Sequence, residues 1–231
     1  MGFFTNTIQA FNHGGFVMWV IFAGQMVSIA IIIERVIALY VKRSLTNAGL
    51  AMTLEEDIKK GQLETVMKKA TAMTGQGTAF GKAALAGTQA AYHMGGNEEI
   101  QSKMDEVLLK EGSLLEKRTG FLAAIGNIGT LAGLLGTIIG LIDSFAAVAN
   151  ANPIEKATLL SNGISMAMHA TAYGLIMAIP ALVMFAVLQN RANALADDLN
   201  QSSLMVCNWL SYNYEPMKQK VTRTGSGNVS I

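Results

Sequence analysis

The stretch Gly126–Phe145, GNIGTLAGLLGTIIGLIDSF, decides the fold because it is long, apolar and regularly interrupted by glycine. It belongs to a run without any charged residue between Arg118 and Asp143. A helix needs about 20 apolar residues to cross a hydrocarbon core of about 30 Å. The stretch therefore predicts a membrane-spanning helix.

Two further runs of this kind lie on either side of it. One ends at Ile33, before the charged pair Glu34-Arg35, and the other reaches from Ala157 to Asn190. Only 14% of the 231 residues are charged, which is unusual for a soluble domain of this length. The sequence therefore predicts an all-α integral membrane protein with three transmembrane helices and a helical cytoplasmic domain.

The basic residues predict the orientation of these helices. Of 17 Lys and Arg residues, only Lys156 lies between the second and third spans, and none precedes Arg35. The positive-inside rule therefore places the N-terminus outside and the C-terminus inside. A secretory signal would begin with basic residues, so the first span is expected to be a retained anchor. The expected organisation is a periplasmic N-terminus (1–14), a first transmembrane helix (15–41), a cytoplasmic helical domain (42–118), a second transmembrane helix (119–148), a periplasmic loop (149–156), a third transmembrane helix with a cytoplasmic extension (157–190), and a cytoplasmic C-terminal helix and tail (191–231).

The segment 42–118 has helical periodicity interrupted by glycine. We expect two short amphipathic helices separated near Gly61, followed by a helix rich in small residues. Asn97 is positioned to cap a further helix. Because no proline occurs between Asn97 and Asn152, this last helix is predicted to continue without a break through the second span.

Glycines form one stripe along the second span. They recur at intervals of three and four residues, which places them on one helix face: Gly126, Gly129, Gly133, Gly136 and Gly140. Small residues let helix backbones approach closely in lipid, so this glycine seam predicts a helix contact. The competing interpretation, a nucleotide-binding loop, lacks the GxxxxGK[ST] pattern. Pro180 in the third span predicts a kink packed inside a helix bundle.

Hydroxyl residues form a second line beside the seam, because Thr130, Thr137 and Ser144 recur every seven residues. Two interpretations remain open at this point. Each hydroxyl can bond back to a carbonyl one turn earlier, as is common in membrane helices. Alternatively, the three can line a hydrated path.

Two ionisable residues within or beside the spans are functional candidates. His169 is the one ionisable group inside the third span, although a neutral imidazole bonded to a neighbouring helix would also explain it. Asp143, near the outer end of the second span, is either functional or a solvated interfacial carboxylate. No carboxylate lies near the middle of any span, so a proton path would need an acid from a partner.

Several classes of function find no support in the sequence. The net charge of +1 argues against a nucleic-acid partner, and Cys207 alone provides no disulfide framework. No nucleophile with a base, and no metal-ligand spacing, is found. We therefore expect no cofactor, no metal and no enzymatic activity, with membrane lipid as an obligatory contact.

The motifs GLLGTIIGLIDSF in span two and GISMAMHATAYGLIMAIPALVMF in span three, with Glu34-Arg35 after span one, resemble the MotA/TolQ/ExbB family. The three-span arrangement is similar to its TolQ/ExbB branch. The resemblance implies an inner-membrane homo-pentameric ring around single-span partners of the ExbD/TolR type. In that family a partner aspartate carries protons past ring threonines, and motif matching puts Thr137 and Thr171 at those positions.

Two residues depart from the family pattern. TolQ and ExbB usually carry a glutamate five residues before the threonine of span three, where this chain has Met166. A proline often stands seven residues before the threonine of span two, where this chain has Thr130. The expected role is a proton-driven motor subunit for transport, a Tol-like function or gliding. The alternative is a non-conducting scaffold that oligomerises through the glycine seam. The choice between H⁺ and Na⁺ stays open, with protons expected because no cation cage is present.

Overall fold

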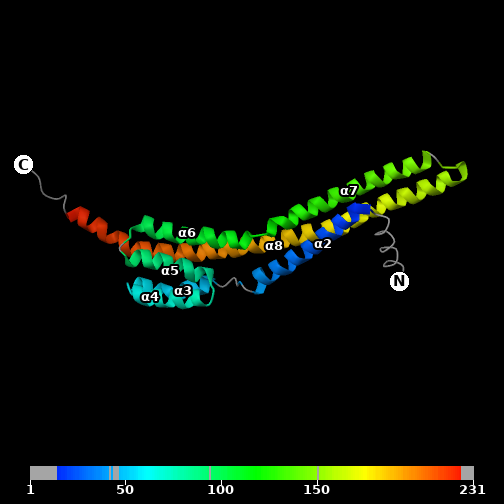
Figure 1. The fold of residues 1–231 in the computed structure, drawn as a ribbon. Helices are drawn as coiled ribbons and strands as arrows, with labels where there is room; N and C mark the ends of the chain where they lie inside the picture. Colours follow the sequence, from blue (N-terminus) through cyan, green and yellow to red (C-terminus); the bar gives the residue numbers. More distant parts are fainter. Residues whose placement is uncertain (1–14, 42, 44–46, 94, 150, 225–231) are drawn as a thin grey trace, which may run out of the picture. The chain divides into compact units, whose positions relative to one another are not determined.

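The computed structural model describes residues 15–41, 43, 47–93, 95–149 and 151–224, and these residues are helical apart from short connections (Figure 1). The all-helical prediction is therefore confirmed. The elements are α2 (Gly15–Val36) with a π-helical turn η1 (Ile37–Val41), α3 (Asn47–Lys59), α4 (Leu63–Gly75), α5 (Ala79–Tyr92), α6 (Asn97–Glu116), α7 (Thr119–Ala149) and α8 (Pro153–Thr224).

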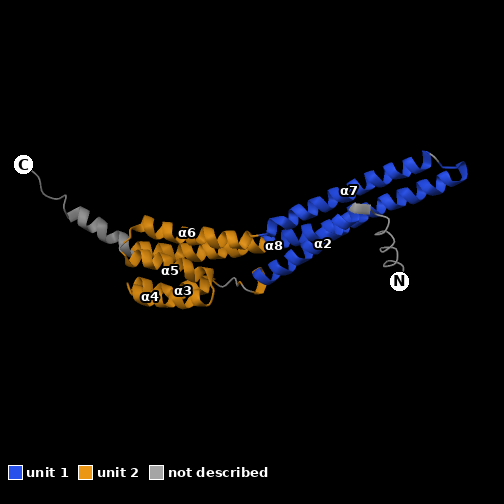
Figure 2. Ribbon diagram, in the orientation of Figure 1, with its two compact units in different colours: residues 1–38, 118–189 blue, residues 39–117, 190–231 orange. Residues whose placement is uncertain are grey.

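The chain divides into two compact units (Figure 2). Unit 1 contains α2, α7 and the first part of α8, whereas unit 2 contains α3 to α6 and the remainder of α8. Three helical stretches are long and apolar enough to cross a membrane, and each overlaps one of the three predicted spans. Most of their side chains are exposed within the chain, including Leu131 and Met168. Such side chains suit a lipid environment, which confirms a multi-pass membrane protein.

Helices α7 and α8 of unit 1 are in backbone contact along the glycine seam. A Cβ added to Gly133 would lie 3.2 Å from the Cα of Gly174 and 3.3 Å from the carbonyl oxygen of Ala170. A Cβ added to Gly174 would lie 2.7 Å from the carbonyl oxygen of Gly129. These neighbours are backbone atoms, which cannot rotate away, so a side chain at Gly174 would force the helices apart and one at Gly133 would require α8 to shift by a few tenths of an ångström.

The partner of the glycine seam is therefore a helix of the same chain. Gly136 meets Ala170 and Gly140 meets Ala167, so α8 covers the seam over several turns. A covered face is not available to a second copy. The scaffold interpretation, in which this seam joins copies, is consequently not favoured.

Pro180 lies within α8, which continues through it as one helical segment. Its side chain is on the exposed surface of the helix. A proline bends a helix by freeing the carbonyl of the preceding turn. Because α8 is one helical segment at Pro180, a kink at this position stays a prediction.

The prediction of one unbroken helix from Asn97 through the second span is wrong. Helix α6 ends at Glu116 and α7 begins at Thr119, with Arg118 in the left-handed conformation at φ 64°. That conformation costs a non-glycine residue roughly 1–2 kcal/mol. Within unit 1, the Arg118 Nη1 atom donates to both carboxylate oxygens of Glu34, at 2.6 and 2.7 Å. This tertiary ion pair holds Arg118, and local sequence gives no sign of it.

Unit 2 has a conventional apolar core formed by the inner faces of α3 to α6 and α8. The predicted break near Gly61 is confirmed, since Gly61 adopts φ 74° between α3 and α4. The predicted cap is displaced by one residue. Gly96 is the N-cap of α6 and makes no side-chain cap hydrogen bond, whereas the Asn97 Oδ1 atom accepts a hydrogen bond from the Ser211 hydroxyl.

One buried acid connects three segments of unit 2. Glu111 is 3% exposed, and its carboxylate accepts hydrogen bonds from Lys82 Nζ at 2.7 Å and Arg43 Nη2 at 3.0 Å. Burial by itself raises the pKa of Glu111, but the hydrogen bonds and charges of Lys82 and Arg43 outweigh it. The net effect is a pKa below the usual 4.5.

The glycine seam predicts that alanine destabilises unit 1 at seam positions but not at a glycine outside the seam. Gly133→Ala and Gly174→Ala should each destabilise unit 1 by about 1–3 kcal/mol, because the added methyl overpacks a backbone contact. Gly120→Ala is the matched control, since nothing lies within 4 Å of its Cβ position. Thermal unfolding of the detergent-solubilised protein measures the difference. Equal melting temperatures for all three variants would contradict the contact, and Gly133→Leu should prevent folding of the helix pair.

The Glu111 cluster predicts pH-dependent stability of unit 2. Because the folded pKa is lowered, the stabilisation is complete above about pH 4.5 and is lost as the pH falls through the folded value. Glu111→Gln should cost about 2 kcal/mol at pH 7 and progressively less in acid. Trp209, which packs against this core, reports unfolding by fluorescence when Trp19 is replaced by Phe. Glu106→Gln, at an exposed acid, should leave the pH profile unchanged.

Candidate functional site

Thr171 connects the two helices of the glycine contact. Its Oγ1 atom donates a hydrogen bond to the carbonyl oxygen of Gly133, at 3.2 Å. The acceptor is accessible because Gly133 has no side chain, and the Thr171 Cα lies 3.3 Å from the position that a Gly133 Cβ would take. A hydroxyl oxygen that donates one bond can still accept others. Thr171 is half-buried, so its oxygen lies at the edge of the helix contact.

The hydroxyls of α7 bond within their own helix. Thr130 donates to the carbonyl of Gly126 at 3.2 Å, Thr137 to that of Leu134 at 2.6 Å, and Ser144 to that of Gly140 at 2.5 Å. The back-bonding interpretation thus describes all three in this chain. It does not remove their capacity to accept a hydrogen bond from water or from a partner.

The hydroxyl line does not stay on one surface. At about 100° per residue, a seven-residue repeat drifts by about 20°, and here the drift is toward the seam. Thr130 and Thr137 are half-buried on the flank of α7, but Ser144 is buried. A Cβ added to Gly163 would collide with the Ser144 hydroxyl, so Ser144 is a packing residue of the α7–α8 contact.

A cavity of about 300 Å³ marks the side of the α7–α8 pair on which α2 packs. Val17 of α2 lines it, together with Asp143 of α7 and Met166 of α8. Helical geometry places Asp143 and Thr137 about 120° apart on α7, and Met166 and Thr171 about 140° apart on α8, on opposite flanks of the contact. We call the flank with Val17 the α2 groove and the flank with the threonines the hydroxyl groove.

The hydroxyl groove brings together three of the predicted site residues. Thr130, Thr137 and Thr171 all lie on this flank, and Thr137 follows Gly133, the acceptor of Thr171, by one helical turn. Among the described residues, α2 packs on the other flank. Hydroxyls at this spacing provide donors and acceptors along the groove but no charge.

The two ionisable candidates lie elsewhere. Asp143 is exposed in the α2 groove, and His169 is exposed on a face of α8 directed away from α7. Within the part of the chain that the structure describes, no hydrogen bond joins the His169 imidazole to a neighbouring helix. A functional role for either residue stays a prediction, as does the role of Met166, which is exposed in the α2 groove.

Sequence reasoning missed the face of α8 that receives the glycine seam. Small residues recur there at intervals of three and four: Ala167, Ala170, Gly174, Ala178 and Ala181, all buried. This periodicity was the available signal, because it matches the glycine pattern of span two. The described residues also include no group of three His, Cys, Asp or Glu side chains placed to hold a metal ion.

The chain was compared with known families and curated proteins. The MotA/TolQ/ExbB proton channel family matches residues 38–201, which cover most of the chain. The chain is 35% identical over 119 residues to the Tol-Pal system protein TolQ of Haemophilus influenzae, covering 51% of this chain and 46% of TolQ. It is 34% identical over 90 residues to the biopolymer transport protein ExbB of Pseudomonas putida, covering 39% and 27%.

A third relative is the biopolymer transport protein exbB1 of Vibrio cholerae, which is 44% identical over 61 residues, or 26% of this chain and 27% of exbB1. The chain therefore spans less than half the length of these three relatives in each match.

Proposed function

The chain belongs to the MotA/TolQ/ExbB proton channel family, and from this premise we propose that it is the ring subunit of a proton-driven motor in the inner membrane. The ring conducts protons together with a single-span partner of the ExbD/TolR type and transmits the energy to the cell envelope. The observation that carries this proposal is the hydroxyl groove, in which Thr171 donates to the carbonyl of Gly133, one helical turn before Thr137 on α7.

The hydroxyl groove supplies relay groups, and the partner supplies the acid. Among the described residues of unit 1, Glu34 is engaged by Arg118, and Asp143 lies on the other flank. A carboxylate in a medium of low dielectric constant favours its neutral, protonated form, so an aspartate on the partner can carry a proton through the membrane. The threonine hydroxyls and water exchange that proton with the two aqueous phases.

We propose an orientation and an assembly on the same premise. The distribution of Lys and Arg supports a periplasmic N-terminus, a cytoplasmic C-terminus and a cytoplasmic unit 2. Five copies surround the partner helices, with the hydroxyl grooves directed toward them and lipid on the outer faces. The protein is not an enzyme and needs no cofactor.

Met166 distinguishes this chain from relatives with a glutamate at that position. Methionine cannot bind or release a proton, so the ring itself contributes fewer acids to the path, and the partner's aspartate carries the proton. We propose protons rather than Na⁺ as the coupling ion, because the polar side chains of the hydroxyl groove are neutral threonines. Transport, a Tol-like role and gliding are the candidate loads.

The threonines provide the test. Thr137→Val and Thr171→Val keep the side-chain shape but remove the hydroxyl, so each should reduce proton flux at least tenfold in liposomes containing the chain and its single-span partner. Thr171→Ser should retain flux, because it restores the donor to Gly133, and Thr130→Val should have a smaller effect. Flux is measured with a pH-sensitive dye under an imposed membrane potential.

The matched control is Thr158→Val, which changes an exposed hydroxyl of α8 outside the groove. Native mass spectrometry verifies that each variant still assembles. Full flux in both Thr137→Val and Thr171→Val would rule out the pore assignment. A stable ring that never conducts with any single-span partner would favour the scaffold.

A further inference from the structure

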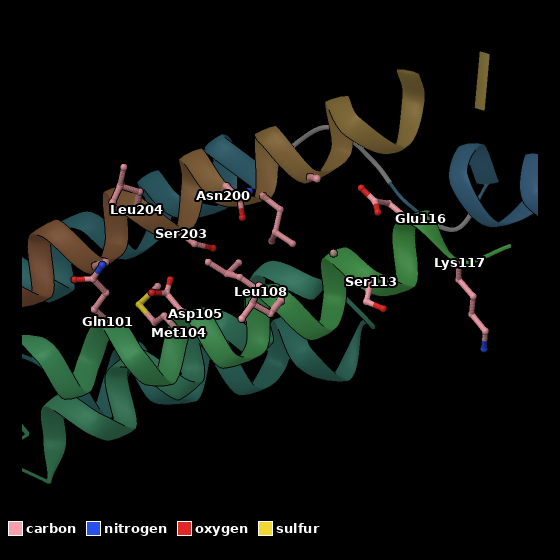
Figure 3. A pocket seen from close by; sticks show the side chains of 15 residues that line it. Gln101, Met104, Asp105, Leu108, Ser113, Glu116, Lys117, Asn200, Ser203 and Leu204 are labelled. Carbon is pink, nitrogen blue, oxygen red and sulfur yellow. The ribbon is translucent and has the colours of Figure 1, made fainter. Parts of the chain in front are cut away.

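A second surface lies in unit 2, on the groove between α6 and the later part of α8. The groove has a volume of about 990 Å³, and Figure 3 shows side chains of the two helices directed toward one another across it. Its floor includes Met104, Leu199 and the small residue Ala196. We call it the α6–α8 groove.

The rims of the α6–α8 groove carry apolar side chains with no cover. Leu109 of α6 is 77% exposed and Leu204 of α8 is 59% exposed. Gly112, in the middle of α6, has nothing within 4 Å of its Cβ position, although glycine is less favourable than alanine inside a helix. No contact within the chain explains this glycine. An apolar groove with a bare backbone on one wall suits the close approach of another helix.

A polar group inside the groove is also without a partner. The Ser203 hydroxyl is buried, lines the groove, and forms no hydrogen bond among the described residues. Burying a hydroxyl without a hydrogen-bond partner costs free energy. The charged side chains at the exposed edge of the same groove are the acids Asp105 and Glu116 and, at the Glu116 end, Lys117 (Figure 3).

The opposite flank of α6 has the complementary chemistry. Lys103, Val107, Lys110 and Leu114 recur at intervals of four, three and four residues, so they form one stripe. Both lysines are exposed, and Lys103 is 3.4 Å from the carboxylate of the exposed Glu106. Leu114 is 41% exposed. At about 100° per residue, the centre of this basic stripe lies on the opposite side of α6 from the centre of the groove lining, and the nearest lining residues, such as Met104 and Ser113, lie about 100° from the stripe residues beside them. The groove and the basic stripe are therefore separate surfaces of one chain.

We propose that the α6–α8 groove of one copy receives the basic stripe of a second copy. Val107 enters between the leucine rims, and the two lysines face the acidic edge. Because groove and stripe are different surfaces, the contact is head-to-tail, and such contacts generate closed rings when the rotation closes. This interface deepens the proposed function, since it rests on copies standing side by side in one orientation.

The levels of the charges agree with such parallel copies. When the α6 helices of two copies are parallel and at equal height, Asp105 of one copy is offset along the axis by two residues from Lys103 of the other and by five residues from its Lys110. These offsets are roughly 3 and 7 Å. Long lysine side chains span these offsets. An antiparallel arrangement would require copies with opposite membrane orientation, which the positive-inside rule opposes.

Disulfide crosslinking tests the contact directly in the full chain. Val107→Cys and Leu204→Cys, which lie at nearly the same height along α6 and α8, are combined in a Cys207→Ser background, and oxidation in membranes should give a covalent ladder from dimers to the closed ring. Tyr92→Cys with Leu204→Cys is the control, since Tyr92 is exposed on α5 outside both surfaces. The experimental pair should crosslink at least tenfold faster than the control pair.

Native mass spectrometry separates the possible failures. An intact ring without crosslinking above the control overturns this interface and leaves the proposed function standing. A monomer in native membranes overturns both. Crosslinking of the Leu204→Cys site to a single-span partner instead of a second copy assigns the groove to that partner and overturns the proposal.

Charge reversal provides an independent measurement. Lys110→Glu and Asp105→Lys should each reduce the assembled fraction several-fold at low salt, and the double variant should restore it. Lys68→Glu changes an exposed lysine of α4 away from both surfaces and should have no effect. Single variants that assemble like the Lys68 control, or a double variant no better than either single one, would overturn the pairing of stripe and groove.

Discussion

The structure of unit 1 depends on the backbone contact between Gly133 of α7 and Gly174 of α8. Lipid offers no hydrophobic drive for helix association, so van der Waals contact and interhelical hydrogen bonds must hold the pair together. Backbone atoms meet here because neither residue has a side chain. Every other feature of the pair follows from that closeness, including which flanks stay open.

The same contact gives the hydroxyls their position. Because Gly133 has no side chain, its carbonyl is accessible from the neighbouring helix, and Thr171 donates a hydrogen bond to it. The seven-residue repeat rotates slowly around α7, so its hydroxyls do not share one surface. Thr137 lies on the flank, whereas Ser144 is buried in the contact with α8. Packing and the candidate proton path are thus adjacent surfaces of one helix pair.

Unit 2 is held by different interactions. Its core buries apolar side chains in the ordinary way, and its buried acid Glu111 is stabilised by Lys82 and Arg43. Removing either cation would leave a charge partly desolvated, which makes the cluster a constraint on how three segments meet. Leu109 and Leu204 on this unit, by contrast, are largely exposed in the single chain, which fits the contact between copies that we propose.

The sequence by itself determined three spans, an all-helical fold and the family, because apolar length and local motifs are properties of consecutive residues. It also marked the glycine face and the two threonines. Only the tertiary structure decided that the seam is filled by α8, that Ser144 is packed away, and that Glu34 holds the break at Arg118. These depend on residues far apart in the chain, whose distances periodicity cannot specify.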